Sequence, residues 1–144
     1  MLNSSVSLGR TGIDVFLLTE FVDDEVGNMV LSFLVENCVS AEYVSVYSGK
    51  RSPLALAFLN SENDASYSFY EDFPEKRTLK VFRDFGPDDI IMFSSILAIS
   101  KEVRSELMEL LGASKRAGST ILYDPNIRLS HMQSQAEAKL VREN

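Results

Sequence analysis

The feature that most constrains the fold is an alternation of short apolar runs with an amphipathic stretch in the second half of the chain. Residues 89–94 and 119–123 are apolar runs, and each follows a turn signal, Gly86-Pro87 or Gly118. The stretch between them repeats apolar residues at helical spacing, at Val103, Leu107, Leu110 and Leu111. Ser100 is the predicted cap of this helix. A strand, helix and strand with short connections predict a right-handed crossover and parallel pairing, so an α/β fold is expected.

The first half of the chain repeats this pattern. Residues 13–18 form a short apolar run next to Gly12, which predicts a buried strand. A helix is predicted over residues 24–36, with Asp23 as its N-cap. Its expected apolar stripe consists of Val26, Met29, Val30, Phe33 and Leu34.

The middle of the chain has a different period. Residues 54–60 and 66–71 are strand-like, and the turn formers of residues 61–65 separate them, so a β-hairpin is predicted. In the second run Tyr67 and Phe69 alternate with more polar positions. This alternation predicts one aromatic and one more polar face, as in a sheet that is covered on one side only.

Composition narrows the function classes. A length of 144 residues fits one domain. The net charge of −7 argues against binding to nucleic acid or to anionic membranes. Cys38 is the single cysteine, which excludes an intrachain disulfide and favours a reducing compartment. The first ten residues do not resemble a signal peptide, and no apolar run reaches the ~20 residues of a membrane span. The expected location is the cytoplasm.

Motifs that carry chemistry on their own are sparse. The sequence contains no Gly-x-Gly, so it has neither a dinucleotide fingerprint nor a Walker loop. His131 is the single histidine, so a histidine metal cluster is excluded and no Ser/His/Asp triad is indicated. The acidic run of residues 23–25 is interpreted as helix capping, because three consecutive acids cannot easily converge on one ion. No metal site is therefore predicted.

Three segments together carry a family resemblance. They are residues 2–12 (Leu-Asn-Ser-Ser-Val-Ser-Leu-Gly-Arg-Thr-Gly), 23–27 (Asp-Asp-Glu-Val-Gly) and 123–128 (Tyr-Asp-Pro-Asn-Ile-Arg). In this order and spacing they resemble the PfkB, or ribokinase-like, carbohydrate kinases, especially the fructokinase and 2-keto-3-deoxygluconate kinase branches. Residues 50–53 and 68–70 also resemble the lid region of that family.

The resemblance implies a ribokinase-like parallel sheet with helices and a β-hairpin lid. The implied reaction is phosphorylation of a sugar hydroxyl, with ATP and Mg as cofactors of the full-length enzyme. Members of the family are about twice as long as this chain. Residues 1–144 are thus expected to form a single partial domain, truncated at both ends, with the lid hairpin at about 44–72.

The family pattern also implies that key parts lie outside this sequence. A strand bearing a substrate-contacting Asp and a Gly-Gly pair would precede Leu2. The Gly-Ala-Gly-Asp motif, which supplies the catalytic base and the anion hole, belongs to the C-terminal half. Asp124 belongs to a different motif and cannot take the role of the base. No catalytic residue is therefore assigned here, and the isolated chain is expected to be inactive.

Four residues match site positions of the family. Asn3 matches an asparagine near the sugar hydroxyls, and Tyr70 matches a lid tyrosine that covers the sugar. Arg128 matches a basic residue aimed at the phosphoryl-transfer region, and Asn126 shapes the same loop. The alternatives are a residue at a helix N-terminus for Asn3, a plain hairpin aromatic for Tyr70 and a surface arginine for Arg128.

Two departures from the family pattern bear on the substrate. Val22 stands where the family has Gly, and Glu71 stands where many keto-sugar acid kinases have Arg. A substrate carboxylate would meet an acid at Glu71, which favours a neutral hexose such as fructose. Two alternatives stay open. One is a truncated, non-catalytic fragment that binds sugar or forms a homodimer through the lid or an exposed sheet edge. The other is a structural Rossmann-like module unrelated to kinases.

Overall fold

The computed structural model describes residues 1–70, 72, 77–79, 84–94 and 100–125. They form two compact units. One contains Met1–Asn3 and the chain from Arg77 onward, and the other contains Ser4–Lys76. The charged, alanine-containing tail after His131, which the sequence predicts to be helical, lies outside the described residues. Within the described ranges, no helix is long and apolar enough to cross a membrane.

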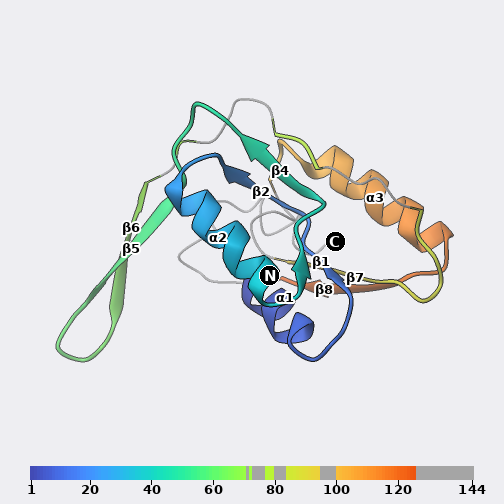
Figure 1. Cartoon of the computed structure of the whole chain (residues 1–144), viewed down its shortest axis with the longest axis horizontal. Helices are drawn as coiled ribbons and strands as arrows, with labels where there is room; N and C mark the ends of the chain where they lie inside the picture. Colours follow the sequence, from blue (N-terminus) through green and yellow to red (C-terminus); the bar gives the residue numbers. More distant parts are fainter. Residues whose placement is uncertain (71, 73–76, 80–83, 95–99, 126–144) are drawn as a thin grey trace. The chain divides into compact units, whose positions relative to one another are not determined.

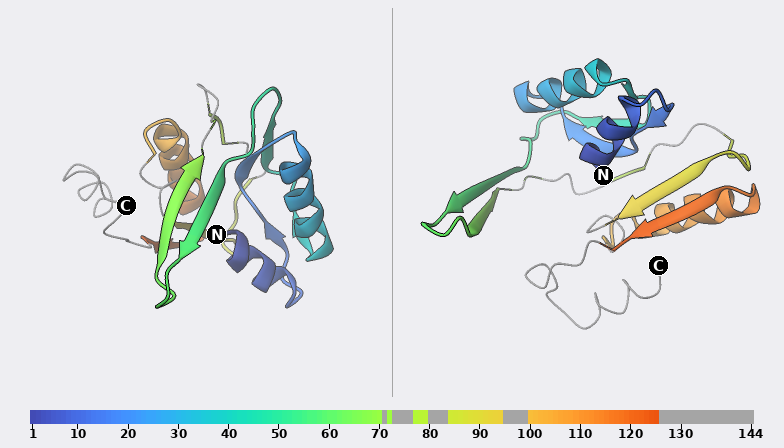
Figure 2. Two further views of the ribbon diagram at one scale, coloured as in Figure 1. Left: turned by 90° about the vertical axis from the view of Figure 1, so that its left-hand side faces the viewer. Right: turned by 90° about the horizontal axis from the view of Figure 1, so that it is seen from below.

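The first unit is the predicted strand–helix–strand. Strands β7 (Ile90–Ser94) and β8 (Thr120–Asp124) pair in parallel, from Ile90 opposite Thr120 to Ser94 opposite Asp124. Helix α3 (Arg104–Arg116) connects them along the chain and lies beside the two strands (Figure 2). This pairing confirms the crossover prediction in its order and strand direction.

Helix α3 buries the apolar stripe that was predicted from spacing. Val103 and Leu107 are 0% and 3% exposed, and Leu110 and Leu111 are buried with them. The predicted cap at Ser100 is wrong, because the helix starts later and its N-cap position is Val103, which makes no side-chain capping bond. Instead, the Ser100 hydroxyl donates to Glu102. Gly118, with a φ of +88°, ends the unit as predicted.

The second unit contains most of helix α1 (Leu2–Gly9) and two short parallel strand pairs. Strand β1 (Val15–Phe16) pairs with β3 (Val39–Ser40), and β2 (Thr19–Val22) pairs with β4 (Val44–Tyr47). Of the strand predicted over residues 13–18, only β1 at residues 15 and 16 is observed, and β2 follows the predicted range. β4 lies inside the region expected for the lid but belongs to a parallel pair.

Helix α2 (Glu25–Glu36) corrects two details of the prediction. Its N-cap is Asp24 and not Asp23, because Asp24 has the extended backbone of a cap and accepts a hydrogen bond from the Gly27 amide. Its buried line runs through Gly27 and Leu34, whereas Met29 is 65% exposed. Phe33, also in the predicted stripe, is exposed as well.

The close approach of α2 to strand β2 explains which of its faces is buried. A Cβ atom added at Gly27 would overlap the carbonyl oxygen of Val22. The absence of a side chain lets the first turn of the helix lie directly against the backbone that leads into it. The line through Gly27 and Leu34 then faces inward, and Met29 turns toward solvent.

The middle of the chain is the predicted hairpin. Strands β5 (Leu54–Leu59) and β6 (Ala65–Tyr70) pair antiparallel, from Leu54 opposite Tyr70 to Leu59 opposite Ala65 (Figure 1). Asn60 organises the turn, since its side-chain oxygen accepts from the amides of Glu62 and Asp64, both at 2.9 Å. Asn63 adopts a φ of +63°, which an asparagine tolerates well.

The register divides the hairpin side chains between two faces, since directly opposite residues share a face. All twelve strand residues are exposed, so the expectation of a sheet covered on one side is not met within the described residues. One face is apolar apart from the Tyr67 hydroxyl and consists of Ala55, Ala57, Leu59, Ala65, Tyr67 and Phe69. The other combines apolar and hydroxyl side chains and consists of Leu54, Leu56, Phe58, Ser66, Ser68 and Tyr70.

Candidate functional site

Open α/β sheets bind ligands at the carboxyl ends of their parallel strands. In the first unit these ends are Ser94 and Asp124, which lie directly opposite each other in the register. Ser94 is buried and Asp124 is exposed. Just before them, the rings of Phe93 and Tyr123 stack with centroids 4.6 Å apart. The edge therefore carries an exposed carboxylate beside a buried hydroxyl, and a stacked aromatic pair precedes them in the two strands.

The four predicted site residues are distributed along the chain. Asn3 lies in the first turn of α1 and is exposed. Tyr70 is the last residue of β6 and is 59% exposed, on the face opposite Tyr67 and Phe69. Asn3 belongs to the first unit and Tyr70 to the second. Asn126 and Arg128 lie outside the described residues.

A hydrogen-bonded carboxylate lies close to the ends of the parallel strands of the second unit. The two oxygens of Asp24 accept from Ser52, from its amide at 2.8 Å and from its hydroxyl at 2.7 Å. Asp24 also accepts from the Gly27 amide at 2.9 Å. The Gly27 amide, followed by the Ser52 hydroxyl and amide, lowers the pKa of Asp24 below its ordinary value of 3.8. Asp24 therefore stays ionised while it joins α2 to the chain entering the hairpin.

A second carboxylate, Asp72, holds the same segment from the other end of the hairpin. It accepts from the Lys50 ammonium at 3.1 Å and from the Arg51 amide at 3.2 Å. The hydrogen bond from Lys50 is the main cause that lowers the pKa of Asp72. These two carboxylates were not found from the sequence, since their partners are 28 and 22 residues away.

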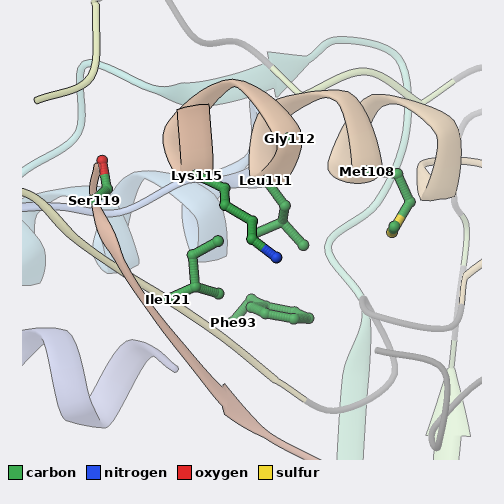
Figure 3. Close-up of a pocket in the computed structure, with 7 residues that line it drawn as sticks. All are labelled: Phe93, Met108, Leu111, Gly112, Lys115, Ser119 and Ile121. Carbon is green, nitrogen blue, oxygen red and sulfur yellow. The ribbon is translucent and has the colours of Figure 1, made fainter. Parts of the chain in front are cut away.

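A groove of about 430 Å³ lies beside α3 in the first unit. Figure 3 shows the Lys115 ammonium close to the side chains of Leu111, Ile121 and Phe93. Ser94 and Asp124 are not among the lining residues, so the groove is separate from the strand ends where ligands are expected. It is lined by Phe93, Met108, Leu111, Gly112, Lys115, Ser119 and Ile121.

The described part of the chain does not supply a metal centre. Within it, no group of three or more histidine, cysteine, aspartate or glutamate side chains could hold a metal ion. The carboxylate oxygens of Asp24 and Asp72 already accept hydrogen bonds from amides, a hydroxyl and an ammonium group.

Comparison with known proteins identifies the family to which this architecture belongs. Residues 1–143 match the model of the pfkB family carbohydrate kinases. The chain belongs to this family. It is 30% identical over 144 residues to the probable fructokinase-4 of Arabidopsis thaliana and 28% identical to the fructokinase of Solanum tuberosum. These matches cover 95% of this chain but only 43% and 44% of the two relatives, so the chain spans less than half of their length.

Solved structures of other kinases share its fold. The apo fructokinase of Vibrio cholerae O395 matches 99% of this pfkB chain with a TM-score of 0.82 at 17% identity, and 50% of that kinase is covered. The aminoimidazole riboside kinase of Salmonella enterica, in complex with aminoimidazole riboside and an ATP analog, matches 97% with a TM-score of 0.77 at 19% identity. The match covers 46% of that chain. The ribokinase-like α/β fold expected from the sequence is thereby confirmed.

Proposed function

We propose that this chain is part of a fructokinase-like sugar kinase. In the whole enzyme, the phosphoryl group of ATP, held with Mg, would pass to a hydroxyl of a neutral hexose such as fructose. The observation that carries the proposal is the family match over residues 1–143, together with relatives named fructokinases at 28–30% identity. The single cysteine, which can form no intrachain disulfide, supports the cytoplasm as its location.

The proposed division of labour follows the chemistry of each side chain. The amide of Asn3 can donate to one sugar hydroxyl and accept from another. Tyr70 would cover the sugar from the hairpin, and its high exposure leaves the ring available for that contact. Arg128 would hold phosphoryl oxygens with its planar guanidinium, and Asn126 would shape the same loop.

The catalytic base and the anion hole are proposed to come from a part of the kinase that this chain does not contain. Asp124 is not proposed as the base, because the residues around it resemble a different motif of the family. Phosphoryl transfer depends mainly on positioning and on electrostatic stabilisation. The 144 residues would thus provide sugar contacts and the hairpin, without the groups that drive the reaction.

Complementation tests this proposal. The C-terminal half of the Solanum tuberosum fructokinase is supplied in trans, the N-terminal strand of that enzyme with its Gly-Gly pair is fused before Leu2 of this chain, and fructose-dependent ADP production is measured. Recovered turnover is expected, and Arg128→Ala should reduce it more than Asn3→Ala because the arginine charge acts on the phosphoryl group in transit. If the two halves associate and no turnover appears, or if Asn3→Ala is the more damaging change, the proposed roles are wrong.

A second candidate is a non-catalytic fragment that binds sugar or associates with itself. The observation that favours it is the hairpin, whose two strands are exposed on both faces and rich in apolar side chains. Such a surface suits a homodimer formed through the hairpin or through an open strand edge. Association of the chain with itself, combined with failure of complementation, would favour this candidate.

A further inference from the structure

The segment that leads from β4 into the hairpin is held by side chains from two distant parts of the chain. Residues 50–52 lie just before Pro53 and the first residue of β5. Asp24, the N-cap of α2, approaches the segment at Ser52. Asp72, which follows β6 by two positions, approaches it at Lys50 and Arg51. Both ends of the hairpin are therefore tied to one short stretch of backbone.

The two carboxylate oxygens of Asp24 accept hydrogen bonds both from α2 and from Ser52. Oδ1 accepts from the Gly27 amide and the Ser52 hydroxyl, at 2.9 and 2.7 Å, while Oδ2 accepts from the Ser52 amide at 2.8 Å. The bond from Gly27 caps α2, and the bonds from Ser52 fix the backbone that enters β5. Because Asp24 begins a helix packed against β2, the bond to Ser52 connects the hairpin to the body of the second unit.

Asp72 closes the base of the hairpin from the exit side. One of its oxygens accepts from the Lys50 ammonium, and the other accepts from the Arg51 amide. A single hydrogen bond at the base would leave the hairpin free to rotate about that point. Bonds to three consecutive residues, 50, 51 and 52, restrict such rotation.

We propose that Asp24 and Asp72 form a two-point clamp on residues 50–52 that fixes the direction of hairpin β5–β6 relative to β2 and β4. They are positioning residues for the hairpin and touch no substrate. Every residue of the two strands is exposed, so the base is where the structure holds the hairpin most directly. This inference does not depend on the proposed kinase function.

The chain offers variants that separate clamping from capping. In Asp24→Ser the new hydroxyl still caps α2, since serine is among the best N-cap residues, but it is too short to reach Ser52. Asp72→Ala removes the second point without touching a helix cap. Asp23→Ala is the matched control, because it removes one carboxylate at the neighbouring exposed position.

The direction of the hairpin is measurable as a distance between spin labels in the full chain. In a Cys38→Ser background, labels are placed at the exposed positions Ser32→Cys on α2 and Glu62→Cys in the hairpin turn. The parent and Asp23→Ala are expected to give one narrow distance peak. The double variant Asp24→Ser/Asp72→Ala is expected to lose that peak to a broad distribution, while the amides of α2 keep their protection from hydrogen exchange.

Two results would overturn the clamp. One is a broad distribution already present in the parent, and the other is a narrow peak that persists in the double variant. If Asp24→Ser weakens α2 itself, Asp72→Ala combined with Ser52→Pro decides the question. This pair removes both the hydroxyl and the amide hydrogen that Asp24 accepts at position 52, and it leaves Asp24 and its cap in place. An unchanged peak in that pair, with intact protection of α2, would refute the proposal, and a broadened peak would support it.

Discussion

The strand–helix–strand of the first unit and the hairpin of the second differ in what happens to their apolar side chains. In α3, Val103 and Leu107 are 0% and 3% exposed, because the helix presents its stripe to β7 and β8. In the hairpin, Phe58 and Phe69 are each 56% exposed. Both regions follow regular apolar periods in the sequence. A period tells which residues share a face, but burial also requires a second layer against that face.

The two regions are also expected to differ in their roles, one in stability and the other in recognition. The α3 layer contributes to folding through buried area, whereas the hairpin contributes little because its side chains stay in water. An exposed apolar face of this kind is typical of a surface that meets a ligand or another chain. The hairpin is accordingly where we expect substitutions to alter binding without altering stability.

The largest expected effect on stability is in the buried stripe. Leu107→Ala should lower the free energy of unfolding by about 2–5 kcal/mol, because it removes buried methyl groups and leaves a cavity. The adjacent Met108 is 45% exposed, so Met108→Ala should cost less than about 1 kcal/mol. Urea denaturation of both variants measures the difference. Equal costs at the two positions would contradict the layer described for α3.

The corresponding change in the hairpin should affect association and leave stability nearly unchanged. Tyr67 and Phe69 stack on the face of the hairpin that also carries Ala55, Ala57, Leu59 and Ala65, with ring centroids 6.1 Å apart. We expect the chain to self-associate, and we expect Tyr67→Ser/Phe69→Ser to shift it to monomer with a change in unfolding free energy within about 1 kcal/mol. Sedimentation velocity at high micromolar concentration measures this. A parent chain that is cleanly monomeric would count against the hairpin as a dimer surface.

The smallest expected effect is that of pH on the hydrogen bonds of Asp24 and Asp72 at the base of the hairpin. The pKa values of Asp24 and Asp72 are both lowered from 3.8, so their folded forms hold protons less tightly than the unfolded chain. The stabilisation that the two ionised carboxylates give to the folded state is therefore complete above their ordinary pKa, and it is lost as the pH falls through the lowered pKa. The spin-label distance peak should remain narrow down to pH 3.8 and broaden only below it. Broadening that begins near pH 6 would indicate another titrating group.

Sequence reasoning succeeded where the signals are local. The hairpin follows from two alternating runs around a turn, and β7, α3 and β8 follow from period and from the glycine at 118. The family resemblance, based on three short segments, was confirmed by the match over residues 1–143. Each of these features is decided by residues that lie close together in the chain.

The details that were wrong depend on contacts between elements. Asp23 and Asp24 are equally good caps by composition, and only the backbone conformation selects Asp24. The buried face of α2 is decided by the close approach at Gly27, which an apolar period cannot reveal. The bond between Asp24 and Ser52 spans 28 residues, so it has no local signal. Tertiary packing set these features.

The central proposal is that these 144 residues carry part of a sugar kinase and that the catalytic base and the anion hole lie outside them. Its most direct test is ADP production by the purified chain with ATP, Mg and fructose, ribose or 2-keto-3-deoxygluconate. General-base assistance is typically worth ~10² to 10⁴ in rate, and a single oxyanion donor ~10² to 10³. Because the proposal places both groups outside these residues, we predict no sugar-dependent ADP above background. Sustained fructose-dependent turnover by the chain alone would contradict the claim, because it would require a catalytic base within these residues.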